Sequence, residues 1–364
     1  MGGIAPDGRG RGSAVSDLES PMALAASPPK RSRRGSGAVT LHDVARLAGV
    51  APITASRAVN HPGQVSDEVR QKVADAITRT GYVPNRLAGG LASTRSRLVA
   101  AVVPTITGPV FLETVRSLTE ALAEQGYQLM LGQAGYAADR EDALLEAIIG
   151  RRPDGIVLTG IMHSDAGRRR LLASGIPVVE TWDLTPTPLD MLVGFSHVEV
   201  GRVVAGFLHA RGRRRFAAVA GDDERATRRL GAFQAEAQRL GLPPVHTVTV
   251  PAPTTLKQGR EALAVLLAVD PVPDAVFCSS DLLALGVLTE ARVQGVSVPG
   301  RLAVVGFGDQ AFAADLAPSL TTVQIQGAAI GRQAARFIVD RAEGRPVEAR
   351  VVDLGFAISE RGST

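Results

Sequence analysis

The side chains best suited to read DNA lie between residues 40 and 60, in the string TLHDVARLAGVAPITASRAVN. Ala45 falls in a predicted first helix, Gly49 at the turn after it and Val50 just beyond, an order that permits the close crossing of a helix-turn-helix. The second helix would enter the major groove, where aliphatic groups meet thymine methyls, hydroxyls bind phosphates or bases and arginine pairs with guanine. An ordinary three-helix bundle would satisfy the same spacing. The expected DNA-contacting residues are Thr40, Ile53, Thr54, Ser56, Arg57 and Asn60.

Three helices must position these side chains. The apolar periodicity predicts a first helix capped by Thr40, with Asp43 as a weaker capping-box partner than glutamate. Pro52 suits the first position of a second helix. A third helix is predicted to begin after Ser66 and to end at Gly81.

The character of the chain changes along its length. The first part is rich in Gly, Ser, Pro, Ala and Arg without apolar periodicity, which is typical of disorder, and its basic run could add phosphate contacts. From Leu98, apolar runs of strand length alternate with helical segments, which indicates buried parallel sheets in an α/β fold. Nearly nine such units exceed one sheet, so two lobes are expected. The predicted parts are a disordered basic tail (1–38), a helix-turn-helix domain (39–84), a hinge (85–97) and a two-lobed core (98–364).

Thr159 and His163 follow the third predicted strand, DGIVLTG. In open α/β sheets ligands bind beyond the carboxyl ends of the strands, so both side chains could line a crevice, although His163 could equally be a surface-loop histidine. The sequence contains no G-x-S-x-G elbow, phosphate-binding glycine loop or His-x-x-x-His pair. We therefore expect no catalytic residues, no cofactor and no metal site.

The composition limits the classes of protein to consider. Hydrophobic residues make up 45% of the 364 residues and aromatic residues 4%, which suits a large aliphatic core. The net charge of +4 is small, so the placement of basic residues matters more than their total. Cys278, the single cysteine, permits neither an intramolecular disulfide nor a multi-cysteine metal site. No segment has the length of a membrane span or a signal peptide, so we expect a cytoplasmic, nucleoid-associated protein that binds no membrane.

The segment from VTLHDVARLAGV through GYVPNRLAGGLAS resembles the DNA-binding domain of the lac repressor family of transcription regulators over its whole length. The resemblance implies a homodimer or tetramer on double-stranded operator DNA. It also implies a hinge helix whose leucine, here Leu91, wedges into the minor groove and kinks the duplex. Two features depart from the family. Ala51 stands where a capping Ser or Thr is common, and Gly89 and Gly90 each make a hinge helix costlier than alanine by about 0.5–1 kcal/mol.

The resemblance continues to the C-terminus, where strings such as PDGIVLTGIMHSD and AVFCSSDLLALG are nearest to the gluconate-operon repressor branch. It implies a core with the periplasmic sugar-binding fold that dimerises and binds an effector between its lobes. An arginine fork suits a carboxylate, and carboxylates accept from sugar hydroxyls, so gluconate or a related sugar acid is the expected effector. The effector-binding residues implied are Phe111, Asp183, Arg229 and Asp281, to which the strand-end argument adds Thr159 and His163.

Other interpretations stay open at this point. Asp281 could be only the N-cap of its helix, Arg229 a solvated neighbour of Arg228, and Phe111 plain core. An exported sugar-binding protein would share the core fold, but it would need a signal peptide and no helix-turn-helix. A regulator that senses a protein or a phosphosugar is a further alternative.

Overall fold

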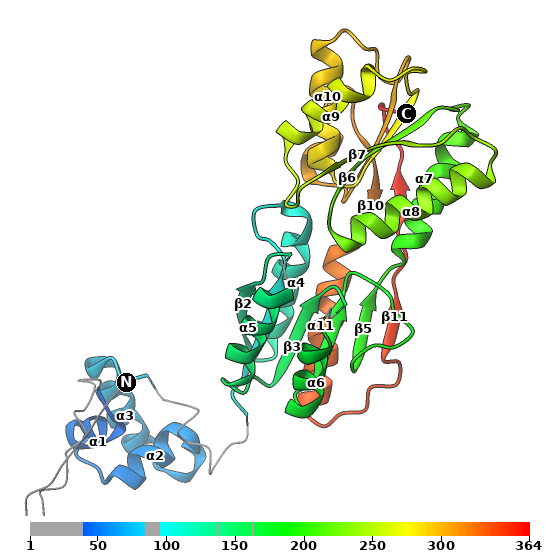
Figure 1. Ribbon diagram of the computed structural model, residues 1–364. Coiled ribbons are helices and arrows are strands. Elements are labelled where there is room, and N and C mark those ends of the chain that lie inside the picture. The colour runs from blue at the N-terminus through cyan, green and yellow to red at the C-terminus, as the bar shows by residue number, and fades with distance from the viewer. Residues whose placement is uncertain (1–38, 84–94, 137, 162–163) are drawn as a thin grey trace, which may run out of the picture. The chain divides into compact units, whose positions relative to one another are not determined.

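The computed structural model describes residues 39–83, 95–136, 138–161 and 164–364. Contacts between residues divide the chain into two compact units, Met1–Asn85 and Arg86–Thr364. Figure 1 shows a small helical unit and a larger unit that contains all the strands of the described residues.

Three α-helices form the described part of the N-terminal unit, residues 39–83, as the periodicity predicted. They are α1 (Leu41–Ala48), α2 (Pro52–Asn60) and α3 (Asp67–Thr80), with a 3₁₀ turn at Pro62–Gln64. The Thr40 hydroxyl accepts from the Asp43 backbone N–H, and the Thr40 backbone N–H donates to Asp43 Oδ2 at 3.0 Å. Asp43 therefore completes the capping box of α1, whereas Ala51 gives α2 no side-chain cap.

Small residues let these helices pack closely. Ala45 of α1 and Ala55 of α2 are buried with Val44 and with Val73 of α3 in one apolar cluster. Gly49 ends α1 with a φ of 68°, in the left-handed region that favours glycine. The tight turn and the small buried side chains together produce the crossing of α1 and α2 that a helix-turn-helix requires.

The larger unit is an α/β structure of two lobes, each built on a six-stranded sheet. In the first lobe all neighbouring strands are parallel. The order is β11 (Val351–Asp353), β5 (Met191–Gly194), β4 (Val178–Thr181), β3 (Gly155–Thr159), β1 (Leu98–Val103) and β2 (Gln128–Gln133).

The sheet of the second lobe is parallel except at one edge, where β12 pairs antiparallel with β10. The order is β12 (Ala357–Ser359), β10 (Thr321–Gln324), β9 (Ala303–Phe307), β8 (Ala275–Cys278), β6 (Phe216–Gly221) and β7 (His246–Val250). The first nine strands coincide with the nine predicted apolar runs to within a few residues. The three C-terminal strands were not predicted, because their sequences, TTVQ, VVD and AIS, are short and do not form continuous apolar runs that are buried throughout.

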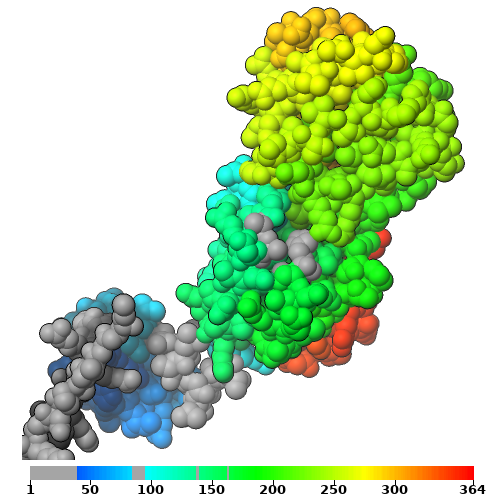
Figure 2. All heavy atoms as spheres, viewed as in Figure 1, coloured from blue at the N-terminus to red at the C-terminus, as the bar shows by residue number. Residues whose placement is uncertain are grey.

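Helices pack against both sheets. The first lobe has α4 (Leu112–Glu124), α5 (Ala138–Ile149), α6 (Asp165–Ser174) and α11 (Gly327–Ala342), and the second has α7 (His197–Ala210), α8 (Glu224–Arg239), α9 (Leu256–Leu267) and α10 (Asp281–Val293). The chain passes between the lobes after β5, after β10 and between β11 and β12. Figure 2 shows the result on the surface, where the yellow and orange segments of the second lobe lie above the cyan and teal segments of the first and meet them at one boundary. Within the described parts of the chain, no helix is long and apolar enough to cross a membrane.

Candidate DNA interface and effector site

Helix α2 has two chemically different faces. Ala55 and Ala58 are buried against the other helices of the unit, whereas Ile53 is 61% exposed and Arg57 and Asn60 are exposed too. Positions 53, 57 and 60 follow the helical repeat, so these three side chains share one solvent-facing stripe. The Arg57 side chain forms no hydrogen bond or ion pair with the residues that the structure describes. The stripe therefore presents an aliphatic group, a guanidinium and an amide to a partner.

Of the other predicted DNA contacts, two lie on α2 beside this stripe, one lies at the start of α1 and one falls outside the described residues. Thr54 and Ser56 are half-buried on α2, and the Asn60 amide donates to Ser56 Oγ at 3.3 Å. Thr40 is exposed, but its hydroxyl also donates to Asp43 Oδ2 at 2.7 Å, so it has a structural role at the start of α1. Leu91 lies outside the described residues, and its role as a minor-groove wedge stays a prediction.

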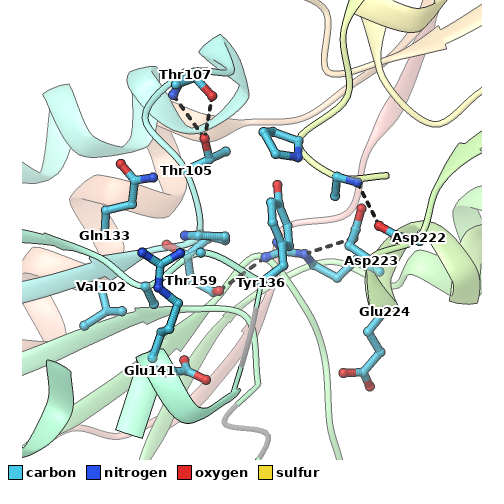
Figure 3. A pocket seen from close by; sticks show the side chains of 17 residues that line it. Val102, Thr105, Thr107, Gln133, Tyr136, Glu141, Thr159, Asp222, Asp223 and Glu224 are labelled. Atoms are coloured by element: carbon cyan, nitrogen blue, oxygen red, sulfur yellow. Dashed lines mark hydrogen bonds and ion pairs between the residues drawn. The ribbon is translucent and has the colours of Figure 1, made fainter. Parts of the chain in front are cut away.

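The larger unit contains a crevice with two adjoining cavities, which we call the inner and outer chambers. The inner chamber has a volume of about 70 Å³, and its walls include Phe111, Trp182, His197, Arg229, Ser280 and Phe307. The outer chamber has a volume of about 630 Å³, and its walls include Thr105, Thr107, Gln133, Glu141, Thr159 and Asp222. Tyr136, Asp223, Arg225 and Ala252 line both chambers. Figure 3 shows the side chains of the outer chamber converging from the two lobes.

These wall residues follow the carboxyl ends of strands, as the sequence analysis predicted for a ligand crevice. From the first lobe, Phe111 follows β1 and Trp182 follows β4. From the second lobe, Arg225 and Arg229 follow β6, and Ser280 follows β8. Parallel strands bring these loops together at one edge of each sheet.

Arg229 is the central cation of the inner chamber, and it is only 4% exposed. Its Nη1 lies 2.9 Å from His197 Nδ1, its Nη2 donates to the Ser279 carbonyl at 3.1 Å, and its guanidinium lies 3.9 Å from the centre of the Phe307 ring. Its buried Nε has no hydrogen-bond partner. Burial lowers the pKa of Arg229 to about 10, which still leaves the side chain charged at neutral pH.

His197 holds Arg229 in place. Burial lowers the pKa of His197 well below its ordinary value, with Arg229 as the next cause, so the ring is neutral at pH 7. The ring Nε2 lies 2.8 Å from the Trp182 carbonyl oxygen, an acceptor only, so Nε2 carries the proton and Nδ1 accepts from Arg229. Gly201 makes this possible, because a side chain there would collide with the Arg229 backbone carbonyl of the neighbouring α8.

Trp182 forms an aromatic wall in a constrained conformation. Its φ is 66°, which costs free energy for a non-glycine residue and occurs where the surrounding structure holds the residue in place. The indole Nε1 donates to Thr114 Oγ1 at 3.0 Å, and the ring meets Phe111 edge-on at 4.9 Å between centroids. The aromatic face is therefore fixed before any ligand arrives.

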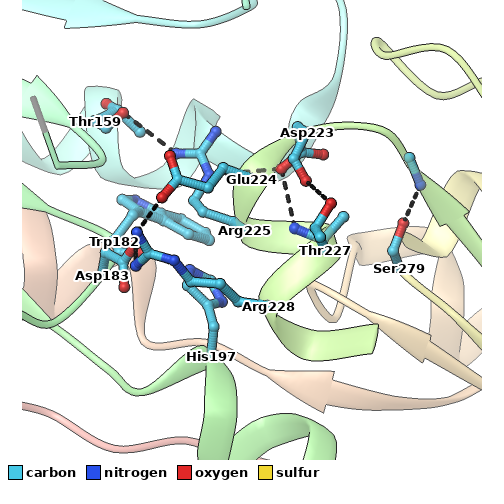
Figure 4. A network of polar contacts seen from close by, with 12 residues as sticks. Thr159, Trp182, Asp183, His197, Asp223, Glu224, Arg225, Thr227, Arg228 and Ser279 are labelled. Carbon is cyan, nitrogen blue, oxygen red and sulfur yellow. Dashed lines mark hydrogen bonds and ion pairs between the residues drawn. The ribbon is translucent and has the colours of Figure 1, made fainter. Parts of the chain in front are cut away.

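Arg225 connects the lobes and was not predicted. Its Nη1 donates to the Thr159 carbonyl oxygen at 3.2 Å, and its guanidinium lies 5.2 Å from the centre of the Phe111 ring. Its Nε is 3.9 Å from Asp223 Oδ1. The sequence signal was the position of Arg225 just after the end of β6, at the same sheet edge as Arg229. Figure 4 shows Arg225, Asp223 and Thr159 in this network.

Comparisons with known proteins identify the family. Residues 40–85 match the sequence profile of the bacterial regulatory proteins of the lacI family, and residues 205–364 match that of the periplasmic binding protein-like domain. The HTH-type transcriptional regulator GntR of Pseudomonas aeruginosa is 38% identical over 336 residues, which cover 92% of this chain and 98% of the relative. The chain belongs to the LacI family.

Two further comparisons extend along the chain. The GntR regulator of Escherichia coli K12 is 33% identical over 324 residues, 89% of this chain and 98% of the relative. A LacI-family transcriptional regulator from Silicibacter pomeroyi superposes with a TM-score of 0.85 at 32% identity, over 89% of this chain and 99% of its own. This LacI-family protein is accordingly a DNA-binding transcription regulator and not an enzyme. LacI-family regulators bind operator DNA and small-molecule effectors.

The structure places three predicted effector residues of this LacI-family regulator in the crevice. Phe111 and Arg229 line the inner chamber, and Thr159 lines the outer one. Arg229 is buried rather than a solvated neighbour of Arg228. His163 lies outside the described residues. Across the described ranges, no cluster of three His, Cys, Asp or Glu side chains could hold a metal ion.

Asp183 is not among the residues that line either chamber, and its effector-binding role stays a prediction. Its carboxylate binds Arg228 at 2.8 Å, and Arg228 also pairs with Glu224. Burial raises the pKa of Asp183, and Arg228 opposes that rise. The contact with Arg228 therefore joins the first lobe to α8 (Figure 4).

Asp281 likewise lines neither chamber. Its carboxylate accepts from Thr322 Oγ1 at 2.6 Å and from the Gln310 backbone N–H at 2.7 Å, so it ties the loop after β9 to strand β10. It is not the N-cap of α10 either, because Ser280 has that role. Burial raises the pKa of Asp281 to about 6.

Proposed function

We propose that this regulator is a repressor that releases operator DNA when gluconate or a related sugar acid binds in the crevice. The observation that carries the proposal is Arg229. Its guanidinium is buried in the wall of the inner chamber, forms no ion pair with a carboxylate of the described residues, and has an unpartnered Nε. A ligand carboxylate matches such a planar fork and supplies the missing negative charge.

The rest of the crevice suits a sugar chain. Phe111 and Trp182 offer flat apolar surfaces to the C–H face of the chain. Thr105, Thr107 and Gln133 line the outer chamber with groups that can exchange hydrogen bonds with hydroxyls. The resemblance to gluconate-operon repressors and the two similar regulators that bear the name GntR support the same effector class.

On the DNA side, we propose that α2 is the recognition helix. Ile53, Arg57 and Asn60 form its exposed stripe, and a homodimer would place two such helices on the halves of a pseudo-palindrome. DNA in the nucleoid is then the site of action. A sugar acid that binds residues of both lobes favours one interlobe angle, and by linkage it weakens operator binding as much as operator weakens ligand binding.

The proposal is tested by fluorescence anisotropy on an operator selected from random double-stranded DNA with the full-length protein. Gluconate should release the operator in a saturable manner, and glucose at equal concentration should leave it bound, because glucose lacks the carboxylate. Light scattering on the complex should show two protomers per selected site. If glucose releases the operator as well as gluconate does, or if neither does, the sugar-acid proposal is wrong.

A further inference from the structure

Two arginines line the inner chamber, and the second of them bears on how a ligand is recognised. We propose that Arg225 binds the effector carboxylate together with Arg229, and that its contact with Thr159 ties the bound carboxylate to the first lobe. Arg225 is then a residue that selects acidic effectors over neutral ones. This inference rests on the proposed function of the crevice as a sugar-acid site.

Both guanidinium groups share one small space. Arg225 and Arg229 lie four residues apart on α8, on the same face of the helix, and both line the inner chamber. A water-sized group requires about 10–15 Å³ of such space, so a chamber of about 70 Å³ holds a group of only a few atoms. A carboxylate in this chamber therefore lies close to both arginines.

Arg225 retains donors for a ligand. Within the described ranges its guanidinium forms one hydrogen bond, from Nη1 to the Thr159 carbonyl oxygen at 3.2 Å. Its contact with Asp223, at 3.9 Å from Nε to Oδ1, is too long for a hydrogen bond. The same Asp223 oxygen accepts from the Ala226 backbone N–H at 3.1 Å, so it is engaged in capping α8. A ligand carboxylate is thus a suitable acceptor for the other N–H groups of Arg225.

The charge of Arg225 adds to that of Arg229. Neither guanidinium forms a hydrogen bond with a carboxylate of the described residues. By contrast, Arg228 on the same helix pairs with two carboxylates and lines neither chamber. Burial is the main cause of the lowered pKa of Arg229, and repulsion from Arg225 contributes to it. Two like charges in one chamber favour an anion that is shared between them.

Contacts with the first lobe hold Arg225 in place. The Thr159 carbonyl oxygen accepts from it (Figure 4), and the Phe111 ring centre lies 5.2 Å from its guanidinium. Gly160 leaves room for the side chain, because a Cβ there would lie 3.3 Å from Arg225 Nη1. Arg225 starts from α8 of the second lobe, whereas these three partners belong to the first. A carboxylate bound by Arg225 is therefore connected to both lobes.

Trp182 provides a direct readout, because it is the single tryptophan of the chain and lines the inner chamber. The full-length protein is titrated with gluconate and with gluconamide, in which a neutral amide replaces the carboxylate, while tryptophan emission is followed and calorimetry confirms each Kd. The ratio of the two Kd values measures what the carboxylate contributes to affinity, so the loss of a purely structural contact leaves this ratio unchanged. Gluconate titrations at several KCl concentrations measure the screening of the charge interaction.

The variants Arg225→Gln and Arg225→Met remove the charge, whereas Arg225→Lys keeps it. Each neutral variant should bind gluconate at least tenfold more weakly than the wild type, because it lacks a hydrogen bond between charged groups. Its affinity for gluconamide should stay within about threefold, and its gluconate affinity should depend less on KCl. Arg225→Lys should keep the wild-type salt dependence and lose less gluconate affinity than the neutral variants.

Arg239→Gln is the matched control, because Arg239 is on the same helix and lines neither chamber. It should match the wild type in every measurement. Thermal unfolding identifies the folded proteins, and a single folded neutral variant is sufficient for the test.

Three outcomes are decisive. A folded neutral variant whose gluconate affinity stays within threefold of the wild type overturns the inference and leaves the sugar-acid function standing. Equal weakening of gluconate and gluconamide, with an unchanged salt dependence, makes Arg225 a structural residue and also overturns the inference. If gluconate gives neither a tryptophan signal nor heat with the wild type, the proposed function itself fails.

Discussion

Replacing Arg229 with methionine separates ligand binding from DNA binding, because the arginine contacts the effector chamber and lies in a different unit from the helix-turn-helix. The variant loses a two-bond fork to the ligand carboxylate. A hydrogen bond to a charged group contributes about 1.5–3 kcal/mol, and about 1.4 kcal/mol corresponds to a tenfold change in affinity. Arg229→Met should therefore weaken gluconate binding by about 100-fold or more.

The same substitution has two opposing effects on the free energy of unfolding. Burial lowers the pKa of Arg229 from 12.5 to about 10, so removing the charge relieves about 3 kcal/mol of desolvation at about 1.36 kcal/mol per pKa unit. Against this, the hydrogen bonds to His197 and to the Ser279 carbonyl are lost, and two buried acceptors stay unpaired at about 1–3 kcal/mol each. The net effect therefore lies between a gain of about 1 kcal/mol and a loss of about 3 kcal/mol, which a domain of ordinary stability tolerates.

Tryptophan emission, calorimetry and thermal unfolding measure these effects, and anisotropy measures operator binding. Operator affinity should stay within twofold of the wild type while gluconate no longer releases the DNA. Arg239→Met is the matched control, because Arg239 is on the same helix, pairs with Glu236 and lines neither chamber. A folded Arg229→Met protein whose gluconate affinity lies within threefold of the wild type would refute the reasoning.

Three more expectations concern other parts of the molecule. Arg57→Ala should lower operator affinity at least tenfold without changing gluconate affinity, since a bidentate base contact contributes about 1–3 kcal/mol. The α3 variant Arg79→Ala is the control. Equal losses of operator affinity in the two variants would show that Arg57 is not a recognition residue. His197→Gln keeps a hydrogen-bond donor and an acceptor, so it should weaken gluconate binding less than tenfold. His197→Leu has neither group and should weaken gluconate binding several tens of times. Equal effects of the two substitutions would show that His197 does not orient Arg229. Asp281 has a pKa of about 6 in the folded protein against 3.8 ordinarily, so the folded state binds its proton more tightly and its contribution to stability falls as pH rises from 4 to 6. The unfolding free energy of Asp281→Asn minus that of the wild type should therefore increase over this interval, by up to about 3 kcal/mol in denaturant titrations, and a flat difference would contradict the assignment.

Local patterns in the sequence were sufficient for the DNA-binding unit. Thr40, Asp43 and Gly49 mark the ends of α1 through capping and backbone preference, which act within four residues along the chain. The stripe of Ile53 and Arg57 follows from the helical repeat alone. Strands β1 to β9 were also predictable, because a strand buried on both faces is a continuous apolar run.

The residues of the effector site were harder to predict from the sequence than the DNA-binding unit, because their contacts depend on the tertiary structure. The family resemblance implied a ligand role for Asp183 and Asp281 as well as for Arg229, but nothing in the sequence states that Arg228 or Thr322 would bind those carboxylates in the folded protein. A buried carboxylate takes whichever donor the fold brings within reach, so its role is set by neighbours distant in sequence.

The roles of Arg225 and His197 also depended on tertiary structure, because both residues belong to the site although the sequence did not predict them. Their sequence neighbours are ordinary helix starts, and only the folding of two lobes against each other brings Arg225 to Thr159 and His197 to both Trp182 and Arg229. The sequence by itself therefore determined the helices of the first unit, strands β1 to β9, the exposed face of α2 and the edge of the sheets at which the crevice lies, since these follow from periodicity and strand direction. Which side chains line the crevice, and which of them bind one another there, was decided by the tertiary structure, because charges act through distance in space and not along the chain.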